Sequence, residues 1–97
     1  MFIVSLTYKT QLSQVDNYIN EHIIYLEKYY NLGKFLVSGR KIPRDGGIIL
    51  VNATDRSELD LIIKEDPFYI ADIANYDITE FMPTMTKQGL DIFKTYI

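Results

Sequence analysis

The order in which apolar patterns alternate along the chain constrains its fold more than any other feature. Short runs with a two-residue period predict strands, and longer stretches with a 3.6-residue period predict helices. Read this way, the chain has the order β-α-β-β-α-β. The expected elements are a strand over 2–8, a helix over 13–32, strands over 34–39 and 47–52, a helix that opens at Asp55, a short helix from Pro67 to about Ala74 and a strand over 76–82.

Local signals mark where these helices begin and end. Ser13, with Asp16 three residues later, resembles an N-cap, and Gly33 is the expected stop of the same helix. Asp55 and Glu58 form a capping pair for the second helix. These signals place both long helices between strands, as the element order requires.

This order is typical of the α+β, ferredoxin-like fold, a four-stranded antiparallel sheet with the helices on one face. At 97 residues and without cysteine, the chain is expected to form a single domain over residues 1–97. The third strand is apolar on both sides, and the fourth carries Tyr76, Ile78 and Met82 on one side and Phe81 on the other. A sheet with two apolar faces needs two covers. We therefore expect a homodimer that buries the open sheet face.

Composition excludes several classes of function. The net charge is −3, which disfavours binding to nucleic acid. No apolar stretch approaches the roughly 20 residues of a membrane span, and the N-terminus lacks the basic region of a signal peptide, so we expect a cytoplasmic protein with no membrane contact. With no cysteine and a single histidine, no ligand spacing for a metal is recognisable. We expect neither a metal nor a cofactor.

His22 is the first candidate functional residue. At about 100° per residue it falls near the centre of the apolar stripe of the first helix, so it faces the domain interior. One interpretation is a core histidine that binds a backbone carbonyl. The other is a half-buried imidazole that acts as a general base near neutral pH.

The segment Asp66-Pro67-Phe68 also has two interpretations. Asp followed by Pro is a typical start of a helix, with the carboxylate capping backbone N–H groups and Pro at the first helical position. Alternatively, Asp66 orients an imidazole, as the acid does in a catalytic dyad.

The segment from Ser38 to Gly47 concentrates positive charge in an acidic chain. Arg40, Lys41 and Arg44 lie within five positions of one another. The segment is either a solvated hairpin or a clamp for a carboxylate-bearing substrate, with Arg40 as the planar donor. Its spacing does not match a phosphate-binding loop.

Five pieces of this chain, taken in order, resemble the YciI-like (YCII-related) family. The resemblance runs from Met1 to about Pro83. The pieces are Glu21-His22, Ser38-Gly39-Arg40, Gly46-Gly47, Asp66-Pro67-Phe68 and Glu80-Phe81-x-Pro83.

The resemblance implies a ferredoxin-like fold paired into a dimeric α+β barrel, with a pocket centred on a histidine and an aspartate that map onto His22 and Asp66. The related dehydrochlorinases and muconolactone isomerase-like proteins act on small ring-derived acids. One position departs from the family, since members often carry Gly where this chain has Asp72. An acidic side chain there is expected to narrow the pocket or to change its charge.

These features together predict a cofactor-independent acid/base enzyme of the lyase or isomerase type that acts on a small organic acid. His22 would be the general base and Asp66 its partner, while the substrate would contact Ser38, Gly39, Arg40, Pro67 and Phe68. Arg40 and the backbone amides near Ser38 and Gly39 would hold the carboxylate or the developing enolate. The alternatives are a non-catalytic module that binds a small anion and a structural dimer in which the pair is only a buried hydrogen bond.

Overall fold

The computed structural model describes residues 1–94 and has the element order that the sequence predicts. Residues 95–97, the end of the predicted domain, lie outside the described part. The elements are β1 (Phe2–Tyr8), α1 (Leu12–Val15), the 3₁₀ helix η1 (Asp16–Tyr18), α2 (Ile19–Asn31), β2 (Phe35–Arg40), β3 (Gly46–Val51), α3 (Arg56–Ile63), α4 (Pro67–Ile70), β4 (Ala74–Glu80) and the 3₁₀ helix η2 (Asp91–Phe93).

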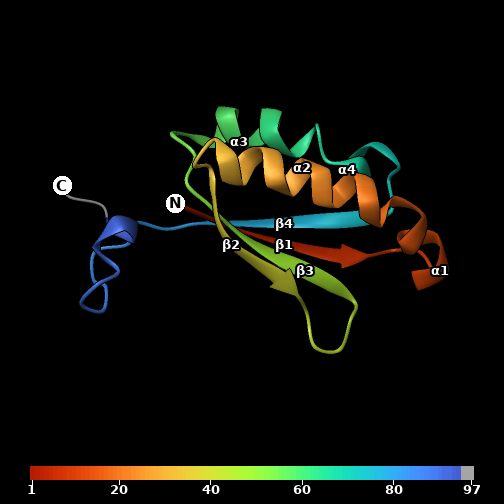
Figure 1. Cartoon of the computed structure of the whole chain (residues 1–97), viewed down its shortest axis with the longest axis horizontal. Helices are drawn as coiled ribbons and strands as arrows, with labels where there is room; N and C mark the ends of the chain where they lie inside the picture. Colours follow the sequence, from red (N-terminus) through yellow and green to blue (C-terminus); the bar gives the residue numbers. More distant parts are fainter. Residues whose placement is uncertain (95–97) are drawn as a thin grey trace.

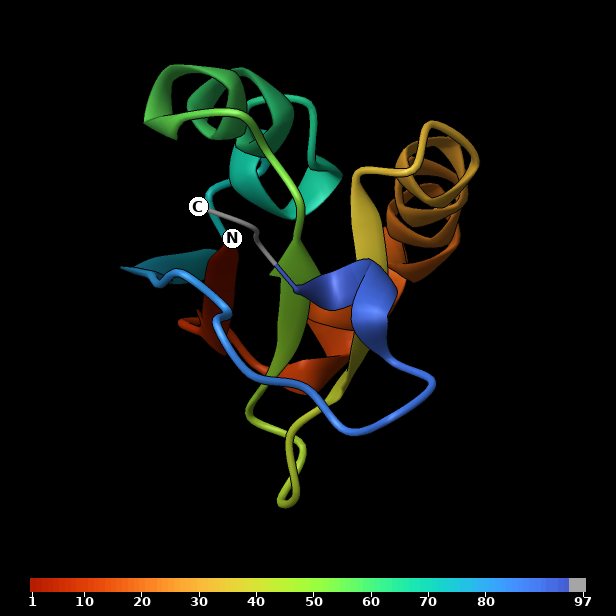
Figure 2. The same cartoon turned by 90° about the vertical axis from the view of Figure 1, so that its left-hand side faces the viewer.

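The four strands form one antiparallel sheet in the order β2-β3-β1-β4. Helices α2, α3 and α4 all lie over the same face of this sheet (Figure 1), and within residues 1–94 no α-helix lies over the other face (Figure 2). The predicted α+β, ferredoxin-like fold is therefore confirmed. It sets α2 beside α4, with α2 also in contact with β2 and α4 with β4, and this packing brings residues distant in sequence together.

Alternation along the central strands places the core between the sheet and the helices. Phe2, Val4 and Leu6 of β1 are each at most 2% exposed, and Val4 stands opposite Ile49 of β3 and Ile78 of β4. Burying one aliphatic or aromatic side chain of this kind contributes roughly 1.5–3 kcal/mol. The two-residue period of β1 is therefore what orients the sheet towards α2 and α3.

The first helical region differs from the sequence prediction. It begins at Leu12 and is interrupted by a 3₁₀ turn before α2 starts, so it is not one helix over 13–32. Ser13 lies inside the first turn, and the N-cap is Gln11, whose carbonyl accepts the backbone N–H groups of Gln14 and Val15. The helix therefore starts one residue before Ser13 on backbone hydrogen bonds, without a side-chain cap.

The predicted fourth strand starts and ends two residues too late. The strand ends at Glu80, because Glu80 stands opposite Phe2, the first residue of β1, and only Phe81 N–H continues the pairing, to the Met1 carbonyl. It starts at Ala74, because α4 ends early. Asp72 has φ of 56°, a left-handed conformation that stops a helix and that glycine adopts most easily.

The helix-free face is apolar on only part of its area. Ile3, Val37, Ile48 and Leu50 lie on this face of β1, β2 and β3. On β4 the same face carries Asn75, Asp77 and Thr79, so the expectation of two apolar faces is wrong for this strand. The reason is the shifted end of β4, which leaves Phe81 and Met82 beyond the strand.

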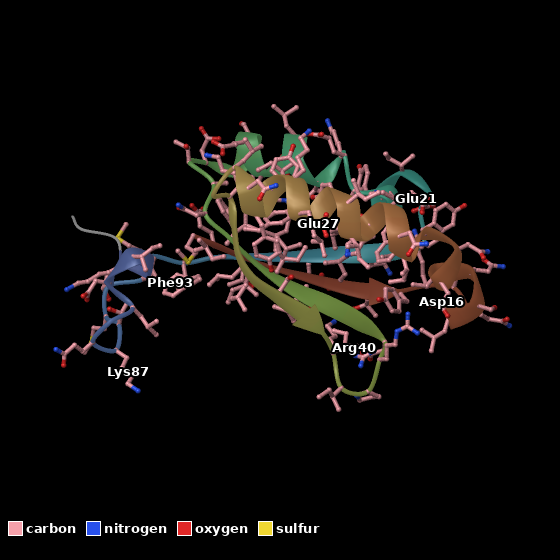
Figure 3. The ribbon with its side chains drawn as sticks, in the orientation of Figure 1. Asp16, Glu21, Glu27, Arg40, Lys87 and Phe93 are labelled. Carbon is pink, nitrogen blue, oxygen red and sulfur yellow. The ribbon has the colours of Figure 1, made fainter. Side chains whose placement is uncertain are left out.

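The segment after β4 lies away from the end of the sheet where α2 meets α4. Lys87 and Phe93 lie at the opposite end of the molecule from Arg40 and Asp16 (Figure 3). This segment therefore takes no part in the candidate site described below.

Candidate functional site

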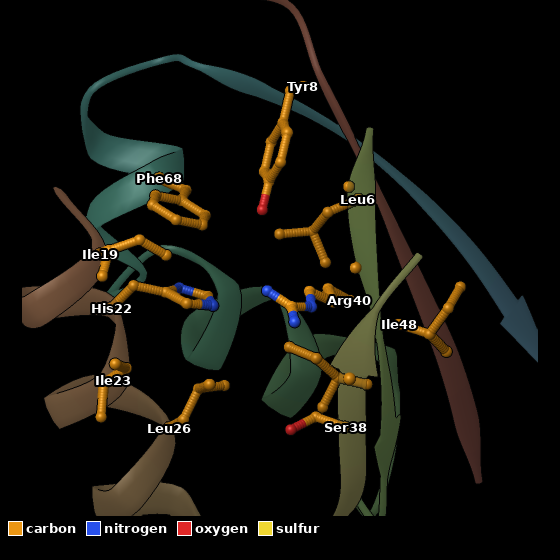
Figure 4. Close-up of a pocket in the computed structure, with 14 residues that line it drawn as sticks. Leu6, Tyr8, Ile19, His22, Ile23, Leu26, Ser38, Arg40, Ile48 and Phe68 are labelled. Carbon is orange, nitrogen blue, oxygen red and sulfur yellow. The ribbon is translucent and has the colours of Figure 1, made fainter. Parts of the chain in front are cut away.

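A cavity of about 190 Å³ lies between α2, α4 and the part of the sheet where β2 and β3 meet their connecting loop (Figure 4). This volume is below the roughly 300–1,000 Å³ of sites for drug-sized ligands, so the cavity suits a small molecule. Its wall is mainly apolar. It is lined by Leu6, Tyr8, Ile19, His22, Ile23, Leu26, Ser38, Gly39, Arg40, Gly46, Gly47, Ile48, Ile49 and Phe68.

His22 is held in this wall by Asp66. The stripe of the first helix turns His22 inward as predicted, and its side chain is 12% exposed. Its Nδ1 lies 2.8 Å from Oδ1 of Asp66, 44 residues further along the chain. An ionised carboxylate accepts hydrogen bonds only, so this contact favours the tautomer with the proton on Nδ1. Nε2 is then the ring nitrogen available to a molecule in the cavity.

The His22 ring is also fixed by stacking. It lies parallel to the ring of Phe68, with centroids 4.0 Å apart and 8° between the planes. The edge of the Tyr8 ring packs against Phe68 in turn. An imidazolium formed at His22 would lie over the negative face of the Phe68 ring, which favours the charge. Phe68 therefore has a structural part in the site as well as a place in the cavity wall.

Asp66 serves both roles that the sequence left open. Its side chain is fully buried, and Oδ1 accepts the backbone N–H of Phe68 at 3.0 Å, which caps α4. The same oxygen contacts His22, and Oδ2 accepts the hydroxyl of Tyr76 at 2.6 Å. A buried charge without partners would cost several kcal/mol. Here three donors satisfy the carboxylate.

Of the three loop cations, only Arg40 belongs to the cavity. Its guanidinium points across the cavity towards the His22 ring (Figure 4). Arg44 is instead bound to Asp16 at 2.6 Å, and Lys41 Nζ donates to the Thr7 hydroxyl at 3.1 Å. These two contacts tie the loop to η1 and β1 and leave Arg40 as the cation that a bound anion would meet.

Of the other residues predicted to contact the substrate, two line the cavity and one does not. Ser38 and Gly39 line the cavity, and the Ser38 hydroxyl shares a hydrogen bond with that of Tyr30 at 2.5 Å. Pro67 does not line it. Pro67 occupies the first position of α4, where its ring fits the helix start, so its contribution is to the turn that carries Asp66 and Phe68.

Tyr8 is not among the candidate residues of the sequence analysis, yet its hydroxyl points into the cavity (Figure 4). Burial raises the pKa of this hydroxyl, so it remains a hydrogen-bond donor at neutral pH. The signal that could have identified it is its place as the last member, with a polar tip, of the apolar row of β1.

Asp72 does not narrow or recharge the cavity, contrary to the expectation from its departure from the family pattern. Its side chain is 81% exposed and is bound to Lys9 at 2.5 Å. It is not part of the cavity wall. The left-handed backbone at this position suits glycine best, and aspartate is one of the residues that tolerate it.

Within residues 1–94, no group of three or more His, Asp or Glu side chains could hold a metal ion. The helices in this part of the chain are also too short or too polar to cross a membrane.

Comparison with known proteins identifies a sequence family and several solved structures of similar fold. The family model of the YCII-related domain matches residues 1–82. The fold is similar to that of 5-chloro-2-hydroxyhydroquinone dehydrochlorinase from Burkholderia phenoliruptrix AC1100, solved in complex with 2,5-dihydroxybenzoquinone, with a TM-score of 0.71 and 19% identity over 84% of this chain and 93% of the other. No curated protein matches the chain significantly in sequence.

Fold and site together define a small ferredoxin-like α+β protein in which a histidine and a buried aspartate meet at an apolar cavity. The family match covers most of the chain, so this protein belongs to the YCII-related domain family.

Proposed function

We propose that this protein is a cofactor-independent acid/base enzyme, of the lyase or isomerase type, whose substrate is a small organic acid. One observation carries the proposal. His22 is bound through Nδ1 to a fully buried carboxylate, and its other ring nitrogen is left for a small apolar cavity. A histidine used only for packing would need no such opening onto a cavity.

In the proposed reaction, Arg40 pairs with the carboxylate of the substrate while the apolar wall holds its carbon skeleton. Nε2 of His22 removes a proton from the carbon next to a carbonyl group, and the electron pair of the C–H bond remains on the substrate as an enolate. Asp66 stabilises the imidazolium that forms. The enolate then either expels a leaving group, as in a lyase, or takes the proton back at another carbon, as in an isomerase.

The structural relative supports a small ring compound as the substrate. It is a 5-chloro-2-hydroxyhydroquinone dehydrochlorinase, and its solved structure is a complex with 2,5-dihydroxybenzoquinone. The cavity of the present protein is small, its wall is apolar, and it presents one cation. Small cyclic acids, hydroxy ketones and lactones are therefore the compounds to test.

Hydrogen exchange in D₂O tests the proposal without knowledge of the complete reaction. The protein is incubated with a panel of these compounds, and loss of C–H signal or formation of product is followed by NMR. We expect Asp66→Asn to slow the reaction of the active compound about ten- to a hundredfold. The reason is that loss of the negative charge beside the imidazolium lowers its stability by the equivalent of about one to two pKa units.

Asp72→Asn is the matched control, because it makes the same chemical change at an exposed carboxylate outside the cavity. Equal rates in Asp66→Asn and the wild type would contradict the proposal. A compound that binds in the cavity and whose hydrogens never exchange would favour the anion-binding alternative.

We also propose that two copies pair through the helix-free sheet face. The apolar part of this face, Ile3, Val37, Ile48 and Leu50, is continuous across three strands, and Val37 is 55% exposed. We expect light scattering to give the mass of a dimer and Ile48→Asp to give that of a monomer. Ile24→Asp, on the outer side of α2, should remain dimeric. A monomeric wild type at micromolar concentration would contradict this pairing.

A further inference from the structure

Tyr76 stands on the far side of Asp66 from the cavity. It belongs to β4, and its ring lines a separate groove beside α3 and α4. Its hydroxyl donates to Oδ2 of Asp66 at 2.6 Å, while His22 contacts Oδ1 at 2.8 Å. The three side chains therefore form one hydrogen-bonded chain from the groove, through a fully buried carboxylate, to the cavity.

The two oxygens of Asp66 have different partners. Oδ1 receives both His22 Nδ1 and the backbone N–H of Phe68. Within residues 1–94, Tyr76 is the one protein donor on Oδ2. Without this donor, Oδ2 of the buried carboxylate would lack a hydrogen bond. The carboxylate could then rotate about the Cβ–Cγ bond of Asp66.

We propose that Tyr76 is a positioning residue of this site: by holding Oδ2 it fixes the Asp66 carboxylate against Nδ1 of His22 and moderates how strongly that carboxylate attracts a proton there. A hydrogen bond from a hydroxyl spreads the negative charge of the carboxylate, so less of it acts on the imidazole. The role in catalysis rests on the proposed function, while the hydrogen-bonded chain can be tested without turnover.

The protonation state of Tyr76 agrees with a donor role. Burial, and then the nearby Asp66 carboxylate, raise the pKa of Tyr76 well above the usual range of a tyrosine. The hydroxyl therefore keeps its proton at every pH at which His22 titrates. The charged or titratable groups that face His22 and Asp66 are Arg40 on β2, Tyr8 on β1, Tyr25 on α2 and Tyr76 on β4.

The test is the pH titration of His22 in Tyr76→Phe. The chain has one histidine, so its ring signals in a proton–nitrogen spectrum are unambiguous. Loss of the Tyr76 donor leaves more negative charge on Asp66, and we expect the His22 midpoint to rise by about half a unit to one unit. Tyr25→Phe is the matched control, because it also removes a buried hydroxyl, one that donates to the Ile62 carbonyl and not to Asp66.

A second substitution covers the case in which Tyr76→Phe does not fold. Fluorotyrosine at position 76 keeps the ring shape and is a stronger donor, so it should move the His22 midpoint downwards. A midpoint that follows the wild type in the Tyr76 variants, or that shifts equally in Tyr25→Phe, would overturn the role of Tyr76. If the midpoint shifts as expected and no compound is turned over, the proposed function fails and the positioning role stands.

Discussion

Gly46→Ala is expected to destabilise the protein by about 3 kcal/mol or more. A Cβ at this position would lie 1.7 Å from the Leu6 carbonyl oxygen and 2.7 Å from its carbon. The obstacle is backbone of the neighbouring strand β1, and the register Thr7–Gly46 prevents either strand from moving aside alone. Marginal stability of 5–15 kcal/mol for a typical domain makes such a loss easy to detect.

Urea denaturation measures this effect, with Gly39→Ala as the matched control. Gly39 is also a strand glycine of the cavity wall, yet nothing lies within 4 Å of its Cβ position. We expect Gly39→Ala to change stability by less than about 1 kcal/mol. Equal losses in the two variants would show that the close approach of β3 to Leu6 does not exist in solution.

His22→Gln is expected to lower turnover of the active compound by about 10²–10⁴-fold, the usual contribution of a general base. Glutamine is the informative replacement because its amide N–H can still donate to Asp66, whereas alanine would leave the buried carboxylate with two donors. The melting temperature should therefore change little while the proton acceptor in the cavity is lost.

Glu21→Gln is the control for this variant, since Glu21 is an exposed neighbour on the same helix. Turnover and melting temperature should both match the wild type there. If His22→Gln unfolds the protein and Glu21→Gln does not, the structural alternative gains support. If turnover is equal in the two variants, His22 is not the base.

Much of this architecture could be predicted because it depends on local periodicity. The two-residue period of β1 and the helical stripe around His22 fix which sides face the core. His22 and Asp66 were expected to meet for two reasons: the fold places their segments on one sheet face, and the family resemblance pairs the two positions.

Other features depend on geometry that periodicity does not contain. Tyr76 was placed on the apolar side of β4, but its bond to Asp66 requires the exact register of β4 against β1 and the turn after α4. That turn passes through Asp72 in a left-handed conformation. A glycine in the sequence would have indicated this conformation, whereas an aspartate does not. The opening of Tyr8 onto a cavity likewise depends on how α2 and α4 pack over the sheet.

The tautomer of His22 tests the central claim most directly. Nitrogen chemical shifts of the single histidine, recorded in the free protein above the midpoint of its titration, distinguish the two neutral forms. Our account predicts that Nδ1, which contacts Asp66, carries the proton and that Nε2 is unprotonated and able to accept a proton from a substrate. A neutral ring with its proton on Nε2 would contradict the account, because His22 would then have no base to offer the cavity.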